Sequence, residues 1–252
     1  MSINRKRILI TGASSGLGAE MARQFAAKGH DLALCARRKS RLETLRDELL
    51  ADNPSTMVSI HALDVTDHEA VFRVFGEAAS AHGGLDRVIV NAGLGKGARI
   101  GTGRFDANLE TAMTNFVGAL AQCEAAMELF RKAGDGHLVV VSSVSAVRGM
   151  RGALTTYAAT KAGVAALAEG IRADVLGTKI KVTTLYPGYI RSEMNERVEQ
   201  KTPLMSSTED GVRAMVRAID REVAEATVPA WPWRPVSAVV RHAPLGVVRK
   251  LT

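Results

Sequence analysis

Aromatic residues are scarce in this chain, at 4% of its 252 residues, whereas 46% are hydrophobic. We therefore expect alanine, valine and leucine to fill the core of one large α/β domain. Cysteine is also rare, and Cys35 and Cys123 fall on a predicted strand and a predicted helix. This placement favours buried, reduced thiols over a disulfide. The six histidines show no metal-ligand spacing, so we expect no metal site.

Long hydrophobic runs are missing as well. No apolar stretch reaches the length of a membrane span, and the N-terminus has no signal-peptide core, which together predict a cytoplasmic protein. The net charge of +7 and the pI near 9.7 are compatible with anionic partners. The sequence carries no recognisable nucleic-acid-binding motif, so we expect no nucleic-acid partner.

Strand-like and helix-like segments alternate along the chain. Strands are predicted at 7–10, 31–36, 57–63, 86–90, 137–142 and 180–185. Helices are predicted at 16–28, 39–51, 67–82, about 106–132, 154–176 and 208–223. Such alternation predicts an α/β fold, a doubly wound parallel sheet of the Rossmann-like kind with helices on both faces, in three layers. We expect one domain over 1–252, with a short or edge strand near 226–229, because Pro229 cannot donate a ladder hydrogen bond.

A glycine-rich turn follows the first predicted strand. Thr11 to Gly18 read T-G-A-S-S-G-L-G and lead directly into a predicted helix. Glycines let the backbone approach a pyrophosphate, and a helix N-terminus offers free N–H groups to it. The spacing is G-x-x-x-G-x-G, not the general G-x-G-x-x-G fingerprint. A nucleotide site is the favoured interpretation, and a glycine turn without a ligand is the alternative.

A tyrosine and a lysine stand four residues apart, at Tyr157 and Lys161. This spacing places both on one face of a helix. A lysine ammonium beside a phenol favours the phenolate, so we expect Lys161 to lower the pKa of Tyr157. A tyrosine tuned in this way can exchange a proton with a carbonyl or alcohol oxygen. An ordinary pair on a helix surface is the alternative.

Together these motifs resemble the short-chain dehydrogenase/reductase (SDR) family, in its single-domain branch of about 250 residues. The resemblance spans about residues 5 to 222. It rests on motifs that occur in the family's order: Thr11–Gly18, Asp64-Val65, Asn91-Ala92-Gly93, Asn115, Ser142-Ser143, Tyr157/Lys161 and Pro187-Gly188.

The resemblance implies an oxidoreductase that transfers a hydride between NADP(H) and a small carbonyl or alcohol substrate. Tyr157 is then the general acid or base, and Lys161 binds the nicotinamide ribose. Asn115 is expected to hold a water in a proton relay; bonding to nearby backbone is the alternative role. The chain could instead be a non-catalytic NADP(H)-binding sensor or scaffold, or, among enzymes, a 3-oxoacyl thioester reductase.

The substrate-binding serine departs from the family spacing. Relatives place it thirteen residues before the tyrosine, where this chain has Val144. We choose Ser143, which fits if the following loop carries one extra residue. Ser145 remains a lesser candidate, and Ser142 is expected to point to the other face of the strand.

The second predicted strand ends in Ala36 and is followed by Arg37 and Arg38. No carboxylate stands there to repel a 2′-phosphate, and guanidinium groups match phosphate geometry. We therefore expect NADP(H) in preference to NAD(H), with Arg37 the better candidate ligand. Both arginines could instead simply begin a solvated helix.

The resemblance implies further cofactor contacts along the same edge of the sheet. Asp64 and Val65 are expected at the adenine, and Asn91 to Gly93 near its ribose. The full expected set is Gly12, Ser14, Ser15, Gly16, Leu17, Gly18, Arg37, Arg38, Asp64, Val65, Asn91, Ala92, Gly93, Tyr157, Lys161, Pro187, Gly188, Ile190 and Ser192.

Three segments are assigned less directly. Residues 193–207 resemble the substrate lid of the family, and Arg148 and Arg151 are expected to be solvated.

The extension at 229–252 contains both tryptophans, Trp231 and Trp233. Packing on a neighbouring subunit is the favoured interpretation, and covering the substrate pocket or resting on a membrane surface are the alternatives. Relatives imply a homo-dimer or homo-tetramer joined through the helices around 106–132 and 154–176.

Overall fold

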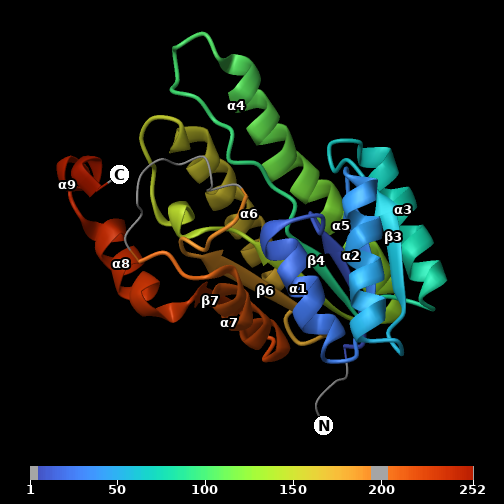
Figure 1. Ribbon diagram of the computed structural model, residues 1–252. Helices are drawn as coiled ribbons and strands as arrows, with labels where there is room; N and C mark the ends of the chain where they lie inside the picture. The colour runs from blue at the N-terminus through green and yellow to red at the C-terminus, as the bar shows by residue number, and fades with distance from the viewer. Residues whose placement is uncertain (1–4, 194–203, 252) are drawn as a thin grey trace.

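The computed structural model describes residues 5–193 and 204–251. Seven parallel strands form one sheet in the order β3-β2-β1-β4-β5-β6-β7 (Figure 1). The strands are β1 (Arg7–Thr11), β2 (Asp31–Ala36), β3 (Val58–Ala62), β4 (Arg87–Val90), β5 (Asp135–Val141), β6 (Lys179–Pro187) and β7 (Glu225–Val228). The order reverses between β1 and β4, as expected for a doubly wound sheet.

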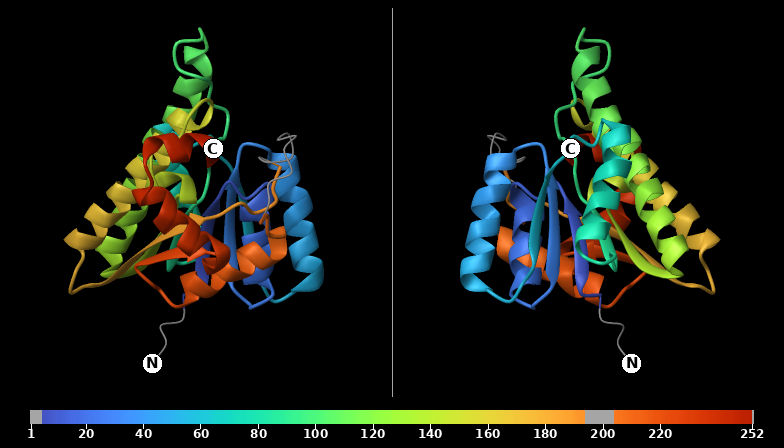
Figure 2. Two further views of the ribbon diagram at one scale, coloured as in Figure 1. Left: turned by 90° about the vertical axis from the view of Figure 1, so that its left-hand side faces the viewer. Right: turned by 90° about the vertical axis from the view of Figure 1, so that its right-hand side faces the viewer.

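Helices cover both faces of the sheet, which gives three layers (Figure 2). One layer contains α1 (Gly16–Ala26), α2 (Lys39–Asp52) and α7 (Thr208–Asp220). The other contains α3 (His68–Ala81), α4 (Phe105–Ala112), α5 (Gly118–Ala133) and α6 (Leu154–Asp174). The chain ends in α8 (Ala230–His242) and α9 (Leu245–Leu251), with α8 against β7.

The central strands β1, β2, β4 and β5 are buried on both faces, as parallel strands between helical layers must be. In β1, Ile8 and Ile10 face the layer of α1, whereas Leu9 faces the layer of α3 and α5. All three side chains are inaccessible to solvent. The core is built mainly from small aliphatic side chains, as the scarcity of aromatic residues predicted.

The predicted fold class and the predicted elements are confirmed, with boundaries within a few residues. The helix expected over 106–132 is α4 and α5 joined by one wide turn, the π-helical segment η1 (Met113–Val117). The predicted lid at 193–207 lies outside the described residues except at 193 and 204–207. The extension at 229–252 forms helices, which the sequence left open.

Both cysteines are buried and unlinked, as expected. Burial raises the pKa of the Cys123 thiol to about 12, and raises that of Cys35 still further. Within the ranges 5–193 and 204–251, no helix is long and apolar enough to cross a bilayer. The same ranges contain no cluster of side chains suited to a metal ion.

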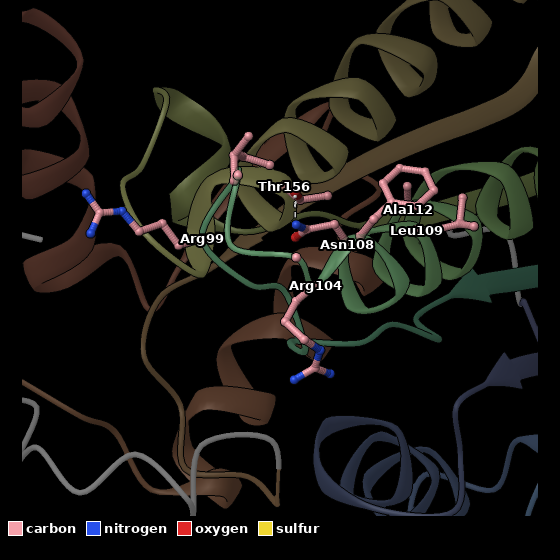
Figure 3. A pocket seen from close by; sticks show the side chains of 10 residues that line it. Arg99, Arg104, Asn108, Leu109, Ala112 and Thr156 are labelled. Carbon is pink, nitrogen blue, oxygen red and sulfur yellow. Dashed lines mark hydrogen bonds between the residues drawn. The ribbon is translucent and has the colours of Figure 1, made fainter.

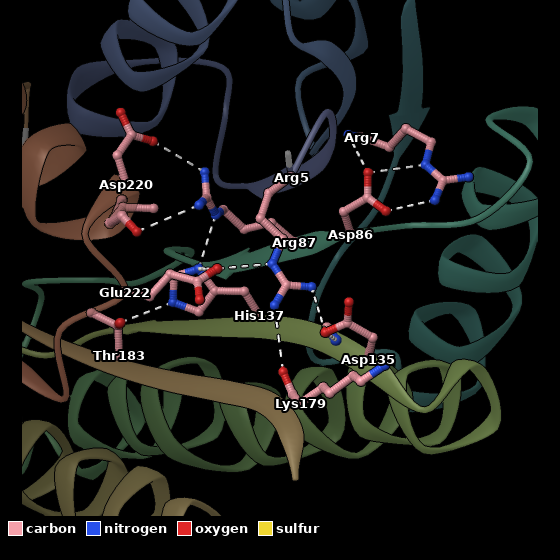
Figure 4. A network of polar contacts seen from close by, with 12 residues as sticks. Arg5, Arg7, Asp86, Arg87, Asp135, His137, Lys179, Thr183, Asp220 and Glu222 are labelled. Carbon is pink, nitrogen blue, oxygen red and sulfur yellow. Dashed lines mark hydrogen bonds and ion pairs between the residues drawn. The ribbon is translucent and has the colours of Figure 1, made fainter. Parts of the chain in front are cut away.

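A buried polar network closes the edge of the sheet opposite the carboxyl ends of the strands (Figure 4). The Nε–H of Arg87 donates to His137 Nδ1 at 2.9 Å, so the ring proton must lie on Nε2. That proton points at Thr183 Oγ1, 2.9 Å away, and the Thr183 hydroxyl donates to the Val223 carbonyl at 2.6 Å. Arg5 bonds Glu222 and Asp135, each at 2.8 Å. The network fixes one tautomer of a neutral histidine.

His137 should make stability depend on pH. Burial, then Arg87 and Arg5, hold its pKa well below the usual 6.5, and the nearby Glu222 is already engaged by Arg5. Unfolding therefore takes up a proton below pH 6.5, and stability is lost as pH falls through that window at up to about 1.4 kcal/mol per pH unit for each such proton. His30, His61 and His82 act in the same direction because burial lowers the pKa of each.

We expect the free energy of unfolding, measured with urea, to fall between pH 7 and pH 5. In His137→Gln, whose amide can accept from Arg87 and donate to Thr183, the slope against pH should be shallower. An unchanged slope in that variant would show that His137 is not a buried neutral group.

Candidate active site

The motifs singled out in the sequence meet at the carboxyl ends of the strands. The turn after β1, the segments after β4 and β5, and the end of β6 all lie at this edge. In open parallel sheets this is the edge at which ligands bind. The structure thus brings together residues that are up to about 180 positions apart in the chain.

The glycine turn is a close approach of backbone to backbone. A Cβ on Gly18 would lie 2.3 Å from the Gly12 carbonyl oxygen and 2.8 Å from Asn91 Nδ2. Asn91 donates its amide to the Thr11 carbonyl at 3.0 Å, and its backbone N–H donates to Thr11 Oγ1 at 3.0 Å. Gly12 has a φ of +64°, which side chains disfavour. Asn91 therefore locks the turn after β4 onto the turn after β1.

Helix α1 begins directly above this turn. Its N-cap residue, Ser15, makes no side-chain bond to the first turn, so the first N–H groups lack that partner. The free N–H groups and the positive end of the helix dipole suit a phosphate group.

Lys161 is held between β5 and α6. The side chain is 5% exposed, and Nζ donates to the Val141 carbonyl at 2.9 Å. The hydroxyl of Ser142 donates to the Lys161 carbonyl at 2.7 Å. Nζ lies 6.0 Å from the centre of the Tyr157 ring. Two successive residues at the end of β5 thereby fix the position of Lys161.

Asn115 lies in the π-helical segment η1 and is 1% exposed. Its Oδ1 accepts from the Leu94 N–H at 2.7 Å, and its Nδ2 donates to the Leu94 carbonyl at 2.8 Å and to Thr160 Oγ1 at 3.3 Å. A Cβ on Gly93 would lie 3.3 Å from Asn115 Oδ1 and 3.4 Å from Lys161 Nζ. Asn115 thus clamps the segment after β4 beside Lys161, and π-turns of this kind are frequent at functional sites.

Ser143 is the serine that reaches Tyr157. Its hydroxyl lies close enough to the Tyr157 phenol to lower the pKa of that phenol, and its Oγ accepts from the Ser145 N–H at 3.1 Å. A short 3-10 turn, η2 (Val144–Val147), follows and accommodates the altered spacing. Ser142 points instead to the Lys161 carbonyl. Of the serines weighed from the sequence, Ser143 is the one whose hydroxyl acts on the phenol.

The expectation that Lys161 lowers the pKa of Tyr157 is wrong in this structure, where that pKa is raised. Burial raises that pKa, the hydrogen bond with Ser143 lowers it, and the nearby Tyr189 phenol raises it again. The Lys161 ammonium is directed at the Val141 carbonyl and does not offset the burial. Burial also lowers the pKa of Lys161, to about 8. Tyr157 is therefore a protonated phenol at neutral pH, and Lys161 titrates close to neutrality.

The two arginines after β2 take different positions. Arg38 Nη2 donates to Ser15 Oγ at 2.7 Å and to Ser14 Oγ at 3.2 Å, so its guanidinium lies over the glycine turn. Arg37 Nη1 lies 4.0 Å from an oxygen of Asp64, on the side expected for adenine. Asp64 Oδ1 is held by Thr66, which donates its N–H at 3.0 Å and its hydroxyl at 2.8 Å.

An acidic residue that the sequence did not single out shares these arginines. Glu193 Oε2 accepts from Arg38 Nη1 at 3.2 Å, and Oε1 contacts Arg41. The bond from Arg41, and then the bond from Arg38, hold the pKa of Glu193 below its ordinary value. Ser192 beside it lies against the glycine turn, because a Cβ on Gly16 would lie 3.3 Å from Ser192 Cβ. No motif predicted this contact between the segment after β6 and the start of α2.

Arg148 corrects a second expectation, because it is not simply a solvated charge. Its Nη1 donates to the Val240 carbonyl at 3.3 Å and to the Arg241 carbonyl at 3.4 Å, and it also contacts the Ala243 carbonyl. These carbonyls stand at the C-terminal end of α8. The guanidinium therefore caps that helix, as a cation at a helix C-terminus does favourably.

A surface pocket of about 380 Å³ lies beside α4 (Figure 3). Thr156 donates its hydroxyl to Asn108 Oδ1 at 2.9 Å, and the Ala98 N–H donates to the same oxygen at 2.9 Å. These bonds fasten the loop after β4 onto the start of α6. Tyr157 and Lys161 do not line this pocket, so we do not assign the chemistry to it.

Gly18 and Gly76 form a matched pair of test positions, because both lie in helices. A Cβ on Gly76 would meet nothing within 4 Å, whereas a Cβ on Gly18 meets backbone at 2.3 Å. Gly76→Ala should stabilise the fold by about 0.5–1 kcal/mol through helix propensity. Gly18→Ala should destabilise it by about 1–3 kcal/mol through overpacking. Urea unfolding measures both, and equal effects would contradict the close approach at the glycine turn.

Comparisons with known proteins agree with this geometry. The model of the family described as short chain dehydrogenase matches residues 6–203. An uncharacterized oxidoreductase of Mycobacterium tuberculosis is 51% identical over 248 residues, which is 98% of each chain. An uncharacterized oxidoreductase of Myxococcus xanthus is 35% identical over 224 residues, 88% of this chain and 86% of that one.

Solved structures give the same result. A short-chain dehydrogenase from Sphingobium yanoikuyae in complex with NADPH superposes with a TM-score of 0.82 at 28% identity, covering 97% of this chain and 94% of that one. An alcohol dehydrogenase from Thermococcus sibiricus complexed with 5-hydroxy-NADP superposes with a TM-score of 0.79 at 26% identity, covering 88% and 95%. The chain therefore belongs to the short-chain dehydrogenase family of oxidoreductases.

Proposed function

We propose that this protein is an NADP(H)-dependent oxidoreductase that interconverts a carbonyl and an alcohol, with Tyr157 as the general acid or base. The observation that carries the proposal is that buried Lys161, fixed by the end of β5, lies 6.0 Å from the Tyr157 ring, with the Ser143 hydroxyl near the same phenol. A nucleotide sensor would need the glycine turn but would not need a proton donor paired with a serine hydroxyl.

The residues present fit a dinucleotide. Gly12 and Gly18 bring the backbone close where a pyrophosphate would lie, and α1 directs free N–H groups to the same place. Gly93 leaves the space between Asn115 and Lys161 free of a side chain. When bound, the nicotinamide supplies or accepts the hydride, and the protein supplies the proton.

The chain's own groups have distinct tasks in this proposal. Tyr157, kept protonated by burial, donates a proton to the substrate oxygen during reduction. Ser143 can hold the same oxygen through its hydroxyl. Lys161, with a pKa of about 8, can bind a ribose hydroxyl and return a proton to the phenol near neutral pH. Asn115 fixes the Leu94 backbone beside them.

The preference for NADP(H) rests on charge. Arg38 lies over the glycine turn, and Arg37 lies beside Asp64. The 2′-phosphate is the group that distinguishes NADP(H) from NAD(H), and a guanidinium binds it well. Glu193 competes for Arg38, so a phosphate must share or displace that carboxylate. The Sphingobium yanoikuyae structure, which contains NADPH, supports the same preference.

We further infer a homo-oligomer joined through the long helices. Three large apolar side chains on α4 and η1 are exposed to solvent: Phe105 by 74%, Leu109 by 45% and Phe116 by 37%. Apolar side chains gathered in this way are typical of a surface that is covered in the assembled protein.

Tyr157→Phe should leave NADPH binding unchanged and lower turnover by about 10²–10⁴-fold, because it removes the proton and little else. Tyr186→Phe is the matched control. Burial raises the pKa of Tyr186, and the charges that act on it are those of Glu225, Arg172 and Glu169, not the groups around Lys161. Fluorescence titration measures binding, and absorbance of NADPH with a panel of ketones and aldehydes measures turnover. Equal turnover in Tyr157→Phe and the wild type would contradict the role of Tyr157 as the proton donor.

Arg38→Ala should weaken NADPH binding about tenfold and NADH binding by less than about twofold. Glu193→Gln removes the competing carboxylate and should tighten NADPH binding about threefold without affecting NADH. Arg46→Ala, in the same helix α2 as Arg41 but paired with Asp47, is the control and should change neither. Equal losses for NADPH and NADH in Arg38→Ala would remove the 2′-phosphate argument.

A further inference from the structure

The C-terminal helix α8 reaches the candidate active site through a pair of aromatic rings. The rings of Tyr189 and Trp233 lie 5.1 Å apart at 50°. Tyr189 is also close enough to Tyr157 for its phenol to raise the Tyr157 pKa. The tail that the sequence left unassigned therefore contacts Tyr189, whose phenol lies near the proton donor.

Trp233 of α8 packs against Gly188, the residue that follows β6. A Cβ on Gly188 would lie 2.2 Å from the indole ring, so only glycine lets the ring take this position. The indole is 6% exposed, and its Nε1 has no hydrogen-bond partner among residues 5–193 and 204–251. A buried tryptophan N–H ordinarily has a partner, and leaving it without one costs about 1–3 kcal/mol. This donor is therefore suited to an acceptor on a bound molecule.

Helix α8 is held in place at both ends. It begins immediately after β7, where the Gly188 N–H donates to the Val228 carbonyl at 2.9 Å. At its other end Arg148 caps the carbonyls of Val240 and Arg241. Arg148 directly follows η2, the turn after Ser143. The tail is thus anchored to the same turn that positions the substrate serine.

The backbone that carries Tyr189 is also fixed. The Ser206 N–H donates to the Tyr189 carbonyl at 3.0 Å, and the neighbouring Ile190 is 2% exposed in the core. Ile190 packs against Gly211 of α7, where a Cβ would lie 2.6 Å from it. The Tyr189 ring therefore stands on a fixed backbone segment, packed against Trp233.

The groups around this pair favour an uncharged ligand. No acidic residue follows Glu225 in the sequence. The Arg148 guanidinium is taken up by backbone carbonyls, and Arg234 of α8 is exposed to solvent. Aromatic rings favour flat apolar groups by burial and by ring contacts, whereas a charged group would lose its hydration without a partner.

We propose that Tyr189 and Trp233 form an aromatic wall of the substrate site, and that this wall selects an uncharged carbonyl or alcohol carrying an aromatic or similarly flat apolar group. The inference rests on the proposed function, because it concerns the substrate of the same site. It assigns the extension at 229–252 to covering the substrate, in preference to a membrane surface or a neighbouring subunit.

The first test uses the intrinsic fluorescence of Trp233. The chain has two tryptophans, and Trp231 is 79% exposed, so Trp231→Phe leaves Trp233 as the single reporter without disturbing the wall. With NADP⁺ bound, acetophenone should quench its emission with a saturable curve, and benzoate, its charged counterpart, should not. Saturation by both alike, or by neither, would overturn the proposal.

The second test separates the wall from general stability. Trp233→Ala should raise KM for acetophenone about tenfold to hundredfold, and should change kcat/KM for acetone, which is too small to reach the wall, by less than about threefold. Trp233→Phe keeps a ring and should recover most of the loss, and Trp231→Ala, on the exposed face of α8, should match the wild type. Equal losses for acetophenone and acetone would assign Trp233 a structural role only.

An NADPH titration made beforehand distinguishes failure of the proposed function from failure of the aromatic wall. If NADPH does not bind, the proposed function fails. If NADPH binds and acetophenone leaves the Trp233 emission unchanged, the aromatic wall fails and the proposed function stands.

Discussion

The position of Lys161 between β5 and α6 is the constraint on which the rest of the site depends. Its Nζ donates to the Val141 carbonyl, and its own carbonyl accepts from the Ser142 hydroxyl. These bonds set the register of α6 against the end of β5. One turn earlier on the helix stands Tyr157, and one residue further along the strand stands Ser143. The closeness of their hydroxyl groups is therefore a consequence of how one buried lysine is held.

Burial changes the pKa values of both Lys161 and Tyr157. A buried ammonium is disfavoured, and its pKa falls to about 8. The same burial raises the pKa of Tyr157. Lysine and tyrosine side chains in water have similar pKa values, about 10.5 and 10, so burial moves the two values apart and leaves the phenol holding its proton more tightly than the ammonium does. The opposite edge of the sheet behaves differently, because there Arg87 and Thr183 fix His137 in one neutral form.

Local patterns were sufficient to predict much of the architecture. The apolar run of β1, the glycine turn and the Tyr157/Lys161 spacing each depend on neighbours in the chain, so the sequence shows them directly. The direction of the Tyr157 pKa was not predictable in this way, because it depends on how deeply the phenol is buried. Nor were the contacts of Arg148 with α8, since the partners lie more than 90 positions away in the chain. Trp233 against Gly188 is of the same kind, as no periodicity in the sequence joins them.

The central claim is that this site delivers a hydride and a proton to a carbonyl group. The most direct measurement uses NADPH carrying deuterium at both C4 positions of the nicotinamide, incubated with the protein and a panel of ketones and aldehydes, with mass spectrometry of the alcohols formed. The account predicts an alcohol carrying one deuterium on its carbinol carbon. Tight binding of NADPH with no deuterium in any alcohol of the panel would contradict it.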